Sequence, residues 1–343
     1  MEVTRLREIL KSARSKRILV IGDLMLDEFI WGKVSRISPE APVPVVEVTG
    51  ESFYAGGAAN VARNLREFTP HVAVLGMVGN DRSGQSLHQL LAEQQIETDA
   101  WITDHRVCTI VKTRVIARQQ QVVRVDREQI IVPSAAQVKQ VVRSVREKLP
   151  AIDAIIFQDY GKGFLTQDLV SRIVEDAQRA DKIVTADPNS RHPIDWIGVT
   201  AVKPNLTEAF FAAGITPKNG SHSIESDPDL AQVGSTLLKK WKTKYLLITL
   251  GEDGMMLFQK NKPPQHIPTR ARQVFDVSGA GDTAIALFTL ALVCNATGIE
   301  ATQVATHGSA VVVGKLGTAT VSPDELTTSF DHHLTPAGPA LPS

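Results

Sequence analysis

The feature that most constrains the fold is a short apolar run followed by a helix-forming segment, a unit that recurs along the chain. Residues 17–23, Arg-Ile-Leu-Val-Ile-Gly-Asp, form the first run, which ends in Gly-Asp. A continuous apolar run is typical of a central strand in a parallel sheet that is covered on both faces. Such sheets bind ligands at the carboxyl ends of their strands. Asp23 and Asp27 are therefore candidate ligands for hydroxyl groups, with a simple turn cap as the equally weighted alternative for Asp23.

Alternation of strands and helices continues over most of the chain. Further strands are predicted at 72–79, 154–157, 183–189, 201–204 and 244–251, and helices at 1–17, 83–93, 134–148, 167–179 and 302–314. Strands that alternate with helices form βαβ units and hence a parallel sheet. We expect one α/β domain over residues 1–330. Beyond Leu326 the composition turns to Thr, His, Pro, Ala and Gly, which predicts a frayed tail that is disordered over 331–343.

Two segments break this rhythm. Three prolines between positions 39 and 44 exclude a helix and a central strand there, and leave edge strands possible. Residues 109–116 alternate like a half-buried antiparallel strand, and 121–126 continue the pattern after a polar turn. We expect insertions at about 28–55 and 105–127 to build a small β-sheet lid over the ligand site, and such lids also serve as homodimer surfaces.

Composition limits the class of partner. The chain has 343 residues, with 37 Lys+Arg against 37 Asp+Glu, so no basic excess attracts nucleic acid or an anionic membrane. The longest apolar stretch, 284–294, is too short to span a bilayer, and the N-terminus lacks the apolar core of a signal peptide. Two cysteines without a Cys-x-x-Cys motif fit a reducing cytosol. We expect a cytoplasmic protein with a small-molecule partner.

A glycine-rich turn at residues 276–282, Asp-Val-Ser-Gly-Ala-Gly-Asp, precedes an apolar helical run. Small residues leave backbone N–H groups uncovered at a helix N-terminus, where the helix dipole favours anions. Asp282 lies in the first helical turn and is a candidate base. An anion cradle beside a base suggests phosphoryl transfer. A plain turn with a favourable first-turn acid is the equally weighted alternative.

Three other junctions carry polar residues. Gly56 and Gly57 open a second helix on which Asn60 supplies a donor and an acceptor. Asp159 and Lys162 follow a strand end and can face the same crevice. At 205–208 an amide and a carboxylate lie three residues apart, on one helical face, which suits Mg²⁺ held partly through water. For this last pair alone, a plain N-cap with a first-turn acid is the favoured alternative.

Three of these motifs together resemble a known family. Residues 276–282 resemble the C-terminal signature of the ribokinase-like (PfkB) carbohydrate kinases, and 56–60 resemble the N-terminal one. Asn-Leu-Thr-Glu at 205–208 resembles the family's Asn-x-x-Glu motif, linked to Mg²⁺ and the nucleotide phosphates. The motifs stand in the family's order over about residues 16–325. The resemblance implies an ATP-dependent sugar kinase with a ribokinase-like fold: a doubly wound, mostly parallel sheet flanked by helices.

Within the family, four segments resemble the kinase domain of the heptose 7-phosphate enzymes of ADP-heptose and lipopolysaccharide synthesis; these are 22–27, 35–45, 159–163 and 313–323. The proline-rich segment is the most specific of them. The chain departs from that group at Asn189, where the group tends to have Lys, and at Gln158, where it has Ser. It also ends soon after the kinase, whereas bifunctional relatives append a nucleotidyltransferase, so we expect a stand-alone kinase or a truncated form.

The resemblance implies phosphorylation of the anomeric hydroxyl of D-glycero-β-D-manno-heptose 7-phosphate. Asp282 would accept the hydroxyl proton, and the backbone N–H groups of Gly279, Ala280 and Gly281 would stabilise charge on the γ-phosphoryl group. The expected sugar-side residues are Asp23, Asp27, Gly56, Gly57, Asn60, Arg118, Gln120, Arg124, Asp159 and Lys162. Of these, the cations for the substrate's phosphate would be Arg118, Arg124 and Lys162, each with a solvated-surface role as an equal alternative.

On the nucleotide side, the resemblance implies the following residues: Asn205, Leu206, Thr207, Glu208, Thr249, Gly251, Gly254, Gly314 and Gly317. Mg²⁺ would lie near Asn205 and Glu208, and a monovalent cation such as K⁺ near Asp276 and Ser278.

Two rival functions remain open at this point. A ribokinase-like kinase for another sugar or sugar phosphate carries the same motifs. The second rival is a catalytically silent binding module on the same fold. The presence of both Asp282 and the Gly-Ala-Gly turn argues against it, because such a module has no need to keep them. A Rossmann dehydrogenase is disfavoured because no Gly-x-Gly-x-x-Gly follows the first strand.

Overall fold

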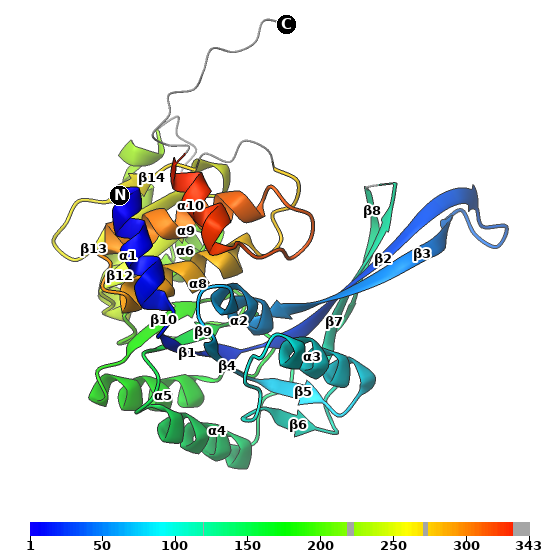
Figure 1. Ribbon diagram of the computed structural model, residues 1–343, viewed down its shortest axis with the longest axis horizontal. Coiled ribbons are helices and arrows are strands. Elements are labelled where there is room, and N and C mark those ends of the chain that lie inside the picture. The colour runs from blue at the N-terminus through cyan, green and yellow to red at the C-terminus, as the bar shows by residue number, and fades with distance from the viewer. Residues whose placement is uncertain (119, 218–222, 270–273, 332–343) are drawn as a thin grey trace, which may run out of the picture.

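The computed structural model describes residues 1–118, 120–217, 223–269 and 274–331. Its helices are α1 Val3–Ala13, α2 Ala58–Arg66, α3 Arg82–Glu93, α4 Ala135–Lys148, α5 Gln167–Arg179, α6 Leu206–Ala213, α7 Pro228–Trp241, α8 Ala280–Val293, α9 Gly298–Val312 and α10 Pro323–Asp331 (Figure 1). Its strands are β1 Arg17–Gly22, β2 Leu24–Ile37, β3 Pro44–Gly57, β4 His71–Leu75, β5 Met77–Gly79, β6 Ile102–Asp104, β7 Ile110–Ala117, β8 Gln120–Arg127, β9 Ala154–Gln158, β10 Ile183–Asp187, β11 Ala201–Val202, β12 Tyr245–Thr249, β13 Met255–Gln259 and β14 Gln265–Ile267.

The main sheet has eight strands in the order β14-β13-β12-β11-β10-β9-β1-β4. From β12 to β4 all pairings are parallel, and β13 and β14 add an antiparallel edge. Side chains alternate across the sheet, so Ile18 and Val20 of β1 join one core while Leu19 and Ile21 join the other. Helices α1, α2, α8, α9 and α10 cover the first face, and α4, α5, α6 and α7 cover the second (Figure 1). The predicted doubly wound α/β fold is confirmed.

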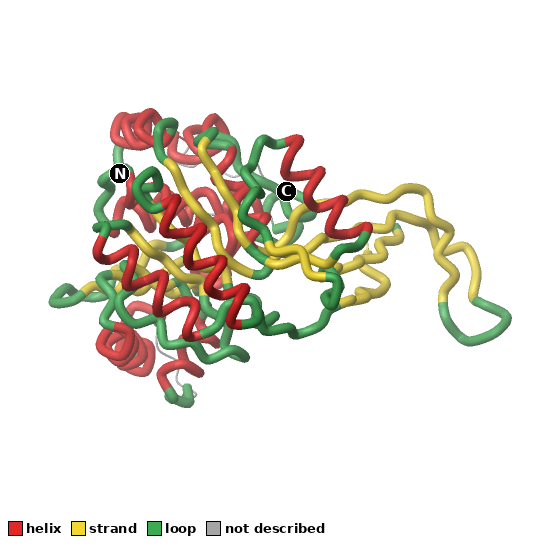
Figure 2. Tube along the Cα trace, turned by 90° about the horizontal axis from the view of Figure 1, so that it is seen from below, coloured by secondary structure: helices red, strands yellow, loops and turns green. Residues whose placement is uncertain are grey.

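A second sheet, the lid sheet, is built from the two insertions expected to form a lid, and its strand order is β3-β2-β7-β8. The long β2–β3 hairpin projects away from the body of the molecule (Figures 1 and 2). As the prolines predict, β3 is an edge strand and Pro44 is its first residue. The prediction for 109–116 is half right, because β7 pairs antiparallel with β8 but parallel with β2.

Two predictions from the sequence are wrong. The apolar run 72–79 is not one strand: β4 belongs to the main sheet, whereas β5 pairs with β6 in a separate two-stranded sheet. Gly76 divides them, and it packs so closely against Leu24 and the Gly22 carbonyl that a side chain would not fit. The expected fraying beyond Leu326 is also wrong, since α10 continues to Asp331; residues 332–343 lie outside the described residues.

Cys108 and Cys294 are both free thiols. Among the described helices, none combines the length and apolarity needed to cross a membrane.

Candidate active site

The candidate site lies where the carboxyl ends of the main-sheet strands meet the N-terminus of α8. Two adjoining cavities make up the cleft. One, of about 550 Å³, is lined by polar residues that include Gln158, Asp187, Lys203, Glu208 and Asp282. The other, of about 650 Å³, is mostly apolar. The two share Thr249, Leu250, Gly251, Val277 and Gly281, so they form one continuous cleft.

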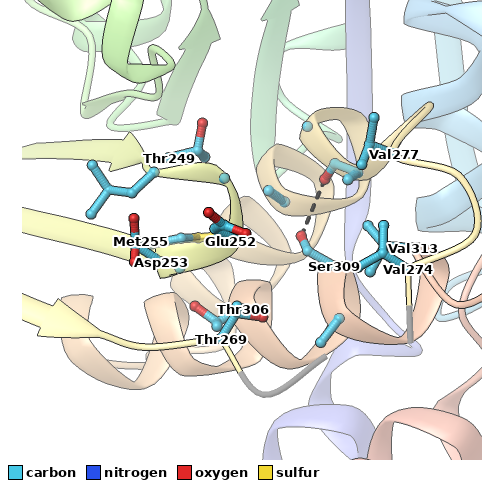
Figure 3. Close-up of a pocket in the computed structure, with 17 residues that line it drawn as sticks. Thr249, Glu252, Asp253, Met255, Thr269, Val274, Val277, Thr306, Ser309 and Val313 are labelled. Atoms are coloured by element: carbon cyan, nitrogen blue, oxygen red, sulfur yellow. Dashed lines mark hydrogen bonds between the residues drawn. The ribbon is translucent and has the colours of Figure 1, made fainter. Parts of the chain in front are cut away.

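The apolar cavity lies between the β12–β13 turn and helices α8 and α9. Figure 3 shows Val274 and Val313 together at one wall, and Met255 and Thr249 at the opposite side. The Ser309 hydroxyl donates to the carbonyl of Ala280 at 3.1 Å and ties α9 to the first residue of α8 (Figure 3). A cavity of this size and lining suits a flat heteroaromatic group, while the polar cavity beside it suits a charged one.

Asp282 is buried in the first turn of α8, whose N-cap is Gly279 with φ 81°. Its carboxylate accepts hydrogen bonds from Asn60 Nδ2 at 2.8 Å, the Tyr160 hydroxyl at 2.8 Å and Gln158 Nε2 at 3.1 Å. Burial raises the pKa of Asp282 to about 7, against the opposing effect of the Asn60 and Tyr160 donors. A carboxylate with this pKa is suited to general base chemistry near neutral pH.

Beside Asp282 lies a buried ion pair. Lys203 Nζ lies 3.0 Å from Asp187 Oδ1, and Gln158 Nε2 donates to Asp187 Oδ2 at 3.2 Å. Burial raises the pKa of Asp187, and the Lys203 ammonium opposes that shift. A methyl group added at Gly281 would lie 3.5 Å from Lys203 Nζ, which places the ammonium beside the start of α8. Lys203 and Tyr160 are candidate residues that sequence reasoning missed. Lys203 directly follows β11, and Tyr160 lies two residues beyond the end of β9.

Asp23, which is expected to bind the sugar, accepts hydrogen bonds from backbone N–H groups. Its carboxylate accepts N–H groups of Tyr160 at 2.9 Å, Lys162 at 3.1 Å and Phe164 at 3.4 Å. Burial, followed by the nearby Asp159 charge, raises the pKa of Asp23 to about 6. The carboxylate therefore caps the loop that follows β9, which is the alternative that the sequence left open.

Three other predicted sugar-side residues, Asp27, Gly57 and Asp159, lie on different segments around the site. Asp27 is buried in β2, next to Gly56, and pairs with Arg114, whose guanidinium stacks 5.2 Å from the Phe29 ring. Gly57 has φ 59° at the start of α2, one turn before Asn60. Asp159 pairs with His192 at 3.0 Å, and this hydrogen bond raises the pKa of His192. Sequence reasoning missed Arg114 and His192.

The predicted phosphate-binding cations do not converge on the cleft. Arg118 and Gln120 are exposed at the β7–β8 turn, and Arg124 pairs with Asp126 on the exposed β8. Lys162 pairs with Glu128 at 2.8 Å. Of all the predicted sugar-side residues, only Asp159 lines one of the two cavities, so these four do not differ from the rest in that respect. Arg118, Gln120 and Arg124 lie on β8 or at the β7–β8 turn, and Lys162 lies in the loop that Asp23 caps.

At the start of α6, Asn205 and Glu208 form a reciprocal capping box. Asn205 Oδ1 accepts the Glu208 N–H, and Glu208 Oε2 accepts the Asn205 N–H, both at 2.9 Å. Burial raises the pKa of Glu208 to about 7. Within the described part of the chain, no three His, Cys, Asp or Glu residues converge on a metal position. Mg²⁺ is commonly bound through one or two carboxylates together with water and substrate phosphates, and this donor set fits it in that way.

The remaining predicted nucleotide residues lie along the cleft, with two exceptions. Leu206 and Thr207 line the polar cavity, Gly254 lines the apolar one, and Thr249 and Gly251 line both. Gly314 and Gly317 line neither cavity.

Asp276, which is predicted to lie near a monovalent cation, accepts hydrogen bonds from two backbone N–H groups. Asp276 accepts the N–H groups of Ser278 at 2.9 Å and Gly317 at 3.1 Å, so its carboxylate joins the loop before α8 to the loop after α9.

Comparison with curated proteins gives relatives that are longer than this chain. The protein named Bifunctional protein HldE of Pelobacter propionicus is 40% identical over 326 residues, which are 95% of this chain and 65% of the relative. That of Geobacter metallireducens is 39% identical over 334 residues, or 97% and 67%. The chain thus spans about two thirds of the length of these relatives.

Among solved structures, phosphofructokinase-2 from Escherichia coli in complex with potassium has a TM-score of 0.74 at 16% identity, covering 94% of this chain and 100% of that one. Arabidopsis thaliana ribokinase complexed with ribose and ATP has a TM-score of 0.68 at 17% identity, covering 92% and 99%. These similarities show the ribokinase-like fold. The family model described as pfkB family carbohydrate kinase matches residues 15–325. The chain therefore belongs to the pfkB family of carbohydrate kinases.

Proposed function

We propose that this protein transfers the γ-phosphoryl group of ATP to the anomeric hydroxyl of D-glycero-β-D-manno-heptose 7-phosphate and forms the 1,7-bisphosphate, a precursor of ADP-heptose. The observation that carries the reaction class is buried Asp282 at the N-terminus of α8, where the polar and apolar cavities meet. The choice of sugar rests on the four segments that resemble heptose 7-phosphate kinases and on about 40% identity to the HldE proteins.

In the proposed reaction, ATP lies along the cleft with its base in the apolar cavity and its phosphates in the polar one. Backbone N–H groups at the start of α8, from Gly279 to Gly281, stabilise charge that develops on the γ-phosphoryl oxygens. The Lys203 ammonium, which pairs with Asp187, lies beside the same turn and is placed to contact the phosphates. Mg²⁺, when bound near Asn205 and Glu208, would neutralise the triphosphate.

The acceptor hydroxyl approaches Asp282 from the side of α2 and the lid. Asp282 takes its proton as the sugar oxygen attacks the γ-phosphorus, and the bond to the β,γ-bridging oxygen breaks to release ADP. General base catalysis of this kind contributes about 10²–10⁴-fold to the rate. We assign the substrate's 7-phosphate to Lys162, because Asp23 fixes the backbone of that residue beside the sugar side of the site. Phosphate binding would then displace Glu128 from Lys162.

We further propose that the lid sheet is a homodimer surface. Apolar side chains stand exposed on it, among them Val48, Phe53, Val123 and Val125, with 40–56% of their surface accessible. Exposed apolar groups gathered on one sheet mark an interaction surface. Replacing Phe53 and Val125 by Glu is expected to convert a dimer to a monomer in sedimentation experiments. A wild-type protein that sediments as a monomer would contradict this assignment.

The reaction proposal is tested by Asp282→Asn. The variant should fold and bind ATP with near-normal affinity in calorimetry, yet lose at least about 10²-fold in ADP release. Near-normal turnover would exclude Asp282 as the base. The best acceptor distinguishes this proposal from a kinase for a different sugar. The absence of turnover with every acceptor would indicate a silent module.

Because the reaction consumes ATP, we place the protein in the cytoplasm.

A further inference from the structure

Gln158 occupies the centre of the sheet edge that faces α8. It is the last residue of β9 and pairs in register with Gly22 of β1 on one side and Asp187 of β10 on the other. Alternation along β9 turns Ala154 and Ile156 into the core beneath α8, so Gln158 points the same way. The side chain is 2% exposed.

The amide nitrogen of Gln158 bridges two buried carboxylates. Nε2 donates to Asp187 Oδ2 at 3.2 Å and to Asp282 Oδ1 at 3.1 Å, and its two hydrogens serve both bonds. The reverse orientation of the amide would place Oε1 against two carboxylate oxygens. With Nε2 toward the two carboxylates, Oε1 is buried without a hydrogen-bond partner among the described residues. Unpartnered buried acceptors are rare, and each one calls for an explanation.

The hydrogen bonds of Asp282 are distributed unequally between its two oxygens. Oδ1 accepts from both Gln158 and Tyr160, whereas Oδ2 accepts from Asn60. A carboxylate oxygen accepts about two hydrogen bonds. Oδ1 is therefore saturated, and Oδ2 keeps one free acceptor position.

We propose that Gln158 is a positioning residue for the reaction proposed above, on which this inference rests: its amide saturates Oδ1 of Asp282 and leaves Oδ2 as the oxygen that takes the acceptor proton. The O–H bond of the sugar breaks and an O–H bond forms on Oδ2. The sugar oxygen bonds to the γ-phosphorus, and the electron pair of the broken P–O bond leaves with ADP. Because the same amide also holds Asp187, which pairs with Lys203, it connects the base to the phosphate side of the cleft.

The test compares three purified variants, assayed for ADP release at saturating ATP with the best sugar acceptor between pH 5.5 and 9. Gln158→Met keeps an unbranched side chain of similar length and removes the hydrogen bonds. Thr185→Val is the matched control, because Thr185 lies on the same face of the neighbouring strand and bonds Thr289 of α8 at 2.7 Å without touching Asp282. Asp282→Asn tests the base itself.

Gln158→Met should lower kcat about 10–100-fold, since a misplaced reacting group costs up to about 10²-fold. The KM for ATP should stay within about twofold. The acid limb of the kcat/KM profile should move about one pH unit upward, because the ionised form of Asp282 loses a donor. Thr185→Val should keep the wild-type profile. If Gln158→Met does not fold, Gln158→Glu keeps the shape, and its added carboxyl should move the acid limb upward as well.

The failures of the two proposals are distinguishable. An active Asp282→Asn variant overturns the proposed function. An inactive Asp282→Asn variant beside a Gln158→Met variant with wild-type kcat and pH profile overturns the role of Gln158 and leaves the kinase intact. A loss of thermal stability in Gln158→Met without a change in the pH profile would show a structural role only, and also refutes the proposal.

Discussion

Asp282→Asn is expected to stabilise the protein at alkaline pH while it abolishes turnover. The pKa of Asp282 is raised from its usual 3.8 to about 7, chiefly by burial. One pKa unit corresponds to about 1.4 kcal/mol, so the ionised side chain costs the folded state about 4 kcal/mol above pH 7. The folded state binds more protons than the unfolded state between about pH 4 and pH 7, so this group's contribution to stability falls as the pH rises through that window.

An asparagine at position 282 can be accommodated because of its neighbours. All three groups that face Asp282 are donors, and an amide nitrogen there needs an acceptor. The Asn60 amide can turn to present Oδ1, which has no partner among the described residues. That turn moves Asn60 Nδ2 to the buried position where Oδ1 had no partner. The variant therefore removes the cost of the charge but leaves one buried donor unpaired, which costs about 1–3 kcal/mol. We expect a net gain of about 1–3 kcal/mol in the free energy of unfolding at pH 8, and a value about 2 kcal/mol lower at pH 5.5.

Urea denaturation of wild type and variant at these two pH values measures the effect. Asp81→Asn is the control of opposite sign, because Asp81 caps α3, accepts the N–H groups of Gly84 and Thr109, and has a lowered pKa. That variant should be less stable than wild type at pH 8. The reasoning is refuted if Asp282→Asn is less stable than wild type at pH 8, or if its advantage is the same at both pH values.

Three further outcomes are expected. Gly279→Ala should cost about 1–3 kcal/mol of stability and reduce turnover, because φ is 81° and the new Cβ would lie 2.9 Å from Asn60 Nδ2; wild-type melting and activity would contradict this. Ala310→Phe fills the apolar cavity and should raise the KM for ATP at least about tenfold with an unchanged KM for the sugar, so an equal rise in both would place ATP elsewhere. Glu208→Gln should raise the Mg²⁺ concentration for half-maximal activity about tenfold, and an unchanged Mg²⁺ titration would remove Glu208 from the metal site.

Local sequence patterns predicted the elements of the main sheet well, because each pattern reports how one segment is buried. The helix at 167–179 has the predicted bounds, and the predicted strand at 17–23 extends only one residue beyond β1. An apolar run does not reveal its partner, however. Residues 72–79 are apolar throughout, yet the close packing at Gly76 sends β4 and β5 into different sheets.

The candidate site was predictable where a motif is local and not where it depends on distant contacts. The glycine turn before Asp282 and the pair Asn205 and Glu208 are local motifs that spacing brings out. For the pair, spacing alone favoured a plain N-cap, and the structure shows that capping box. The bridge from Gln158 to Asp187 and Asp282 joins positions up to 124 residues apart, and spacing cannot show it.

The choice among cations on the lid sheet stays a prediction, because burial there depends on distant contacts. Arg114 and Arg124 face each other across β7 and β8. Arg114 is largely buried against Asp27, whereas Arg124 is half exposed. Strand alternation gives the face on which a side chain lies, but not which end of a lid packs against the body.

The most direct test of the central claim is an ADP-release assay with ATP across a panel of acceptors: D-glycero-β-D-manno-heptose 7-phosphate, fructose 6-phosphate, ribose and unphosphorylated heptose. Asp282→Asn serves as the blank. We predict that kcat/KM for the heptose 7-phosphate exceeds that for every other acceptor by about 10²-fold or more, as expected when a buried site pairs with a substrate phosphate. A clear preference for an unphosphorylated sugar would contradict the heptose 7-phosphate assignment, and no turnover with any acceptor would contradict the kinase itself.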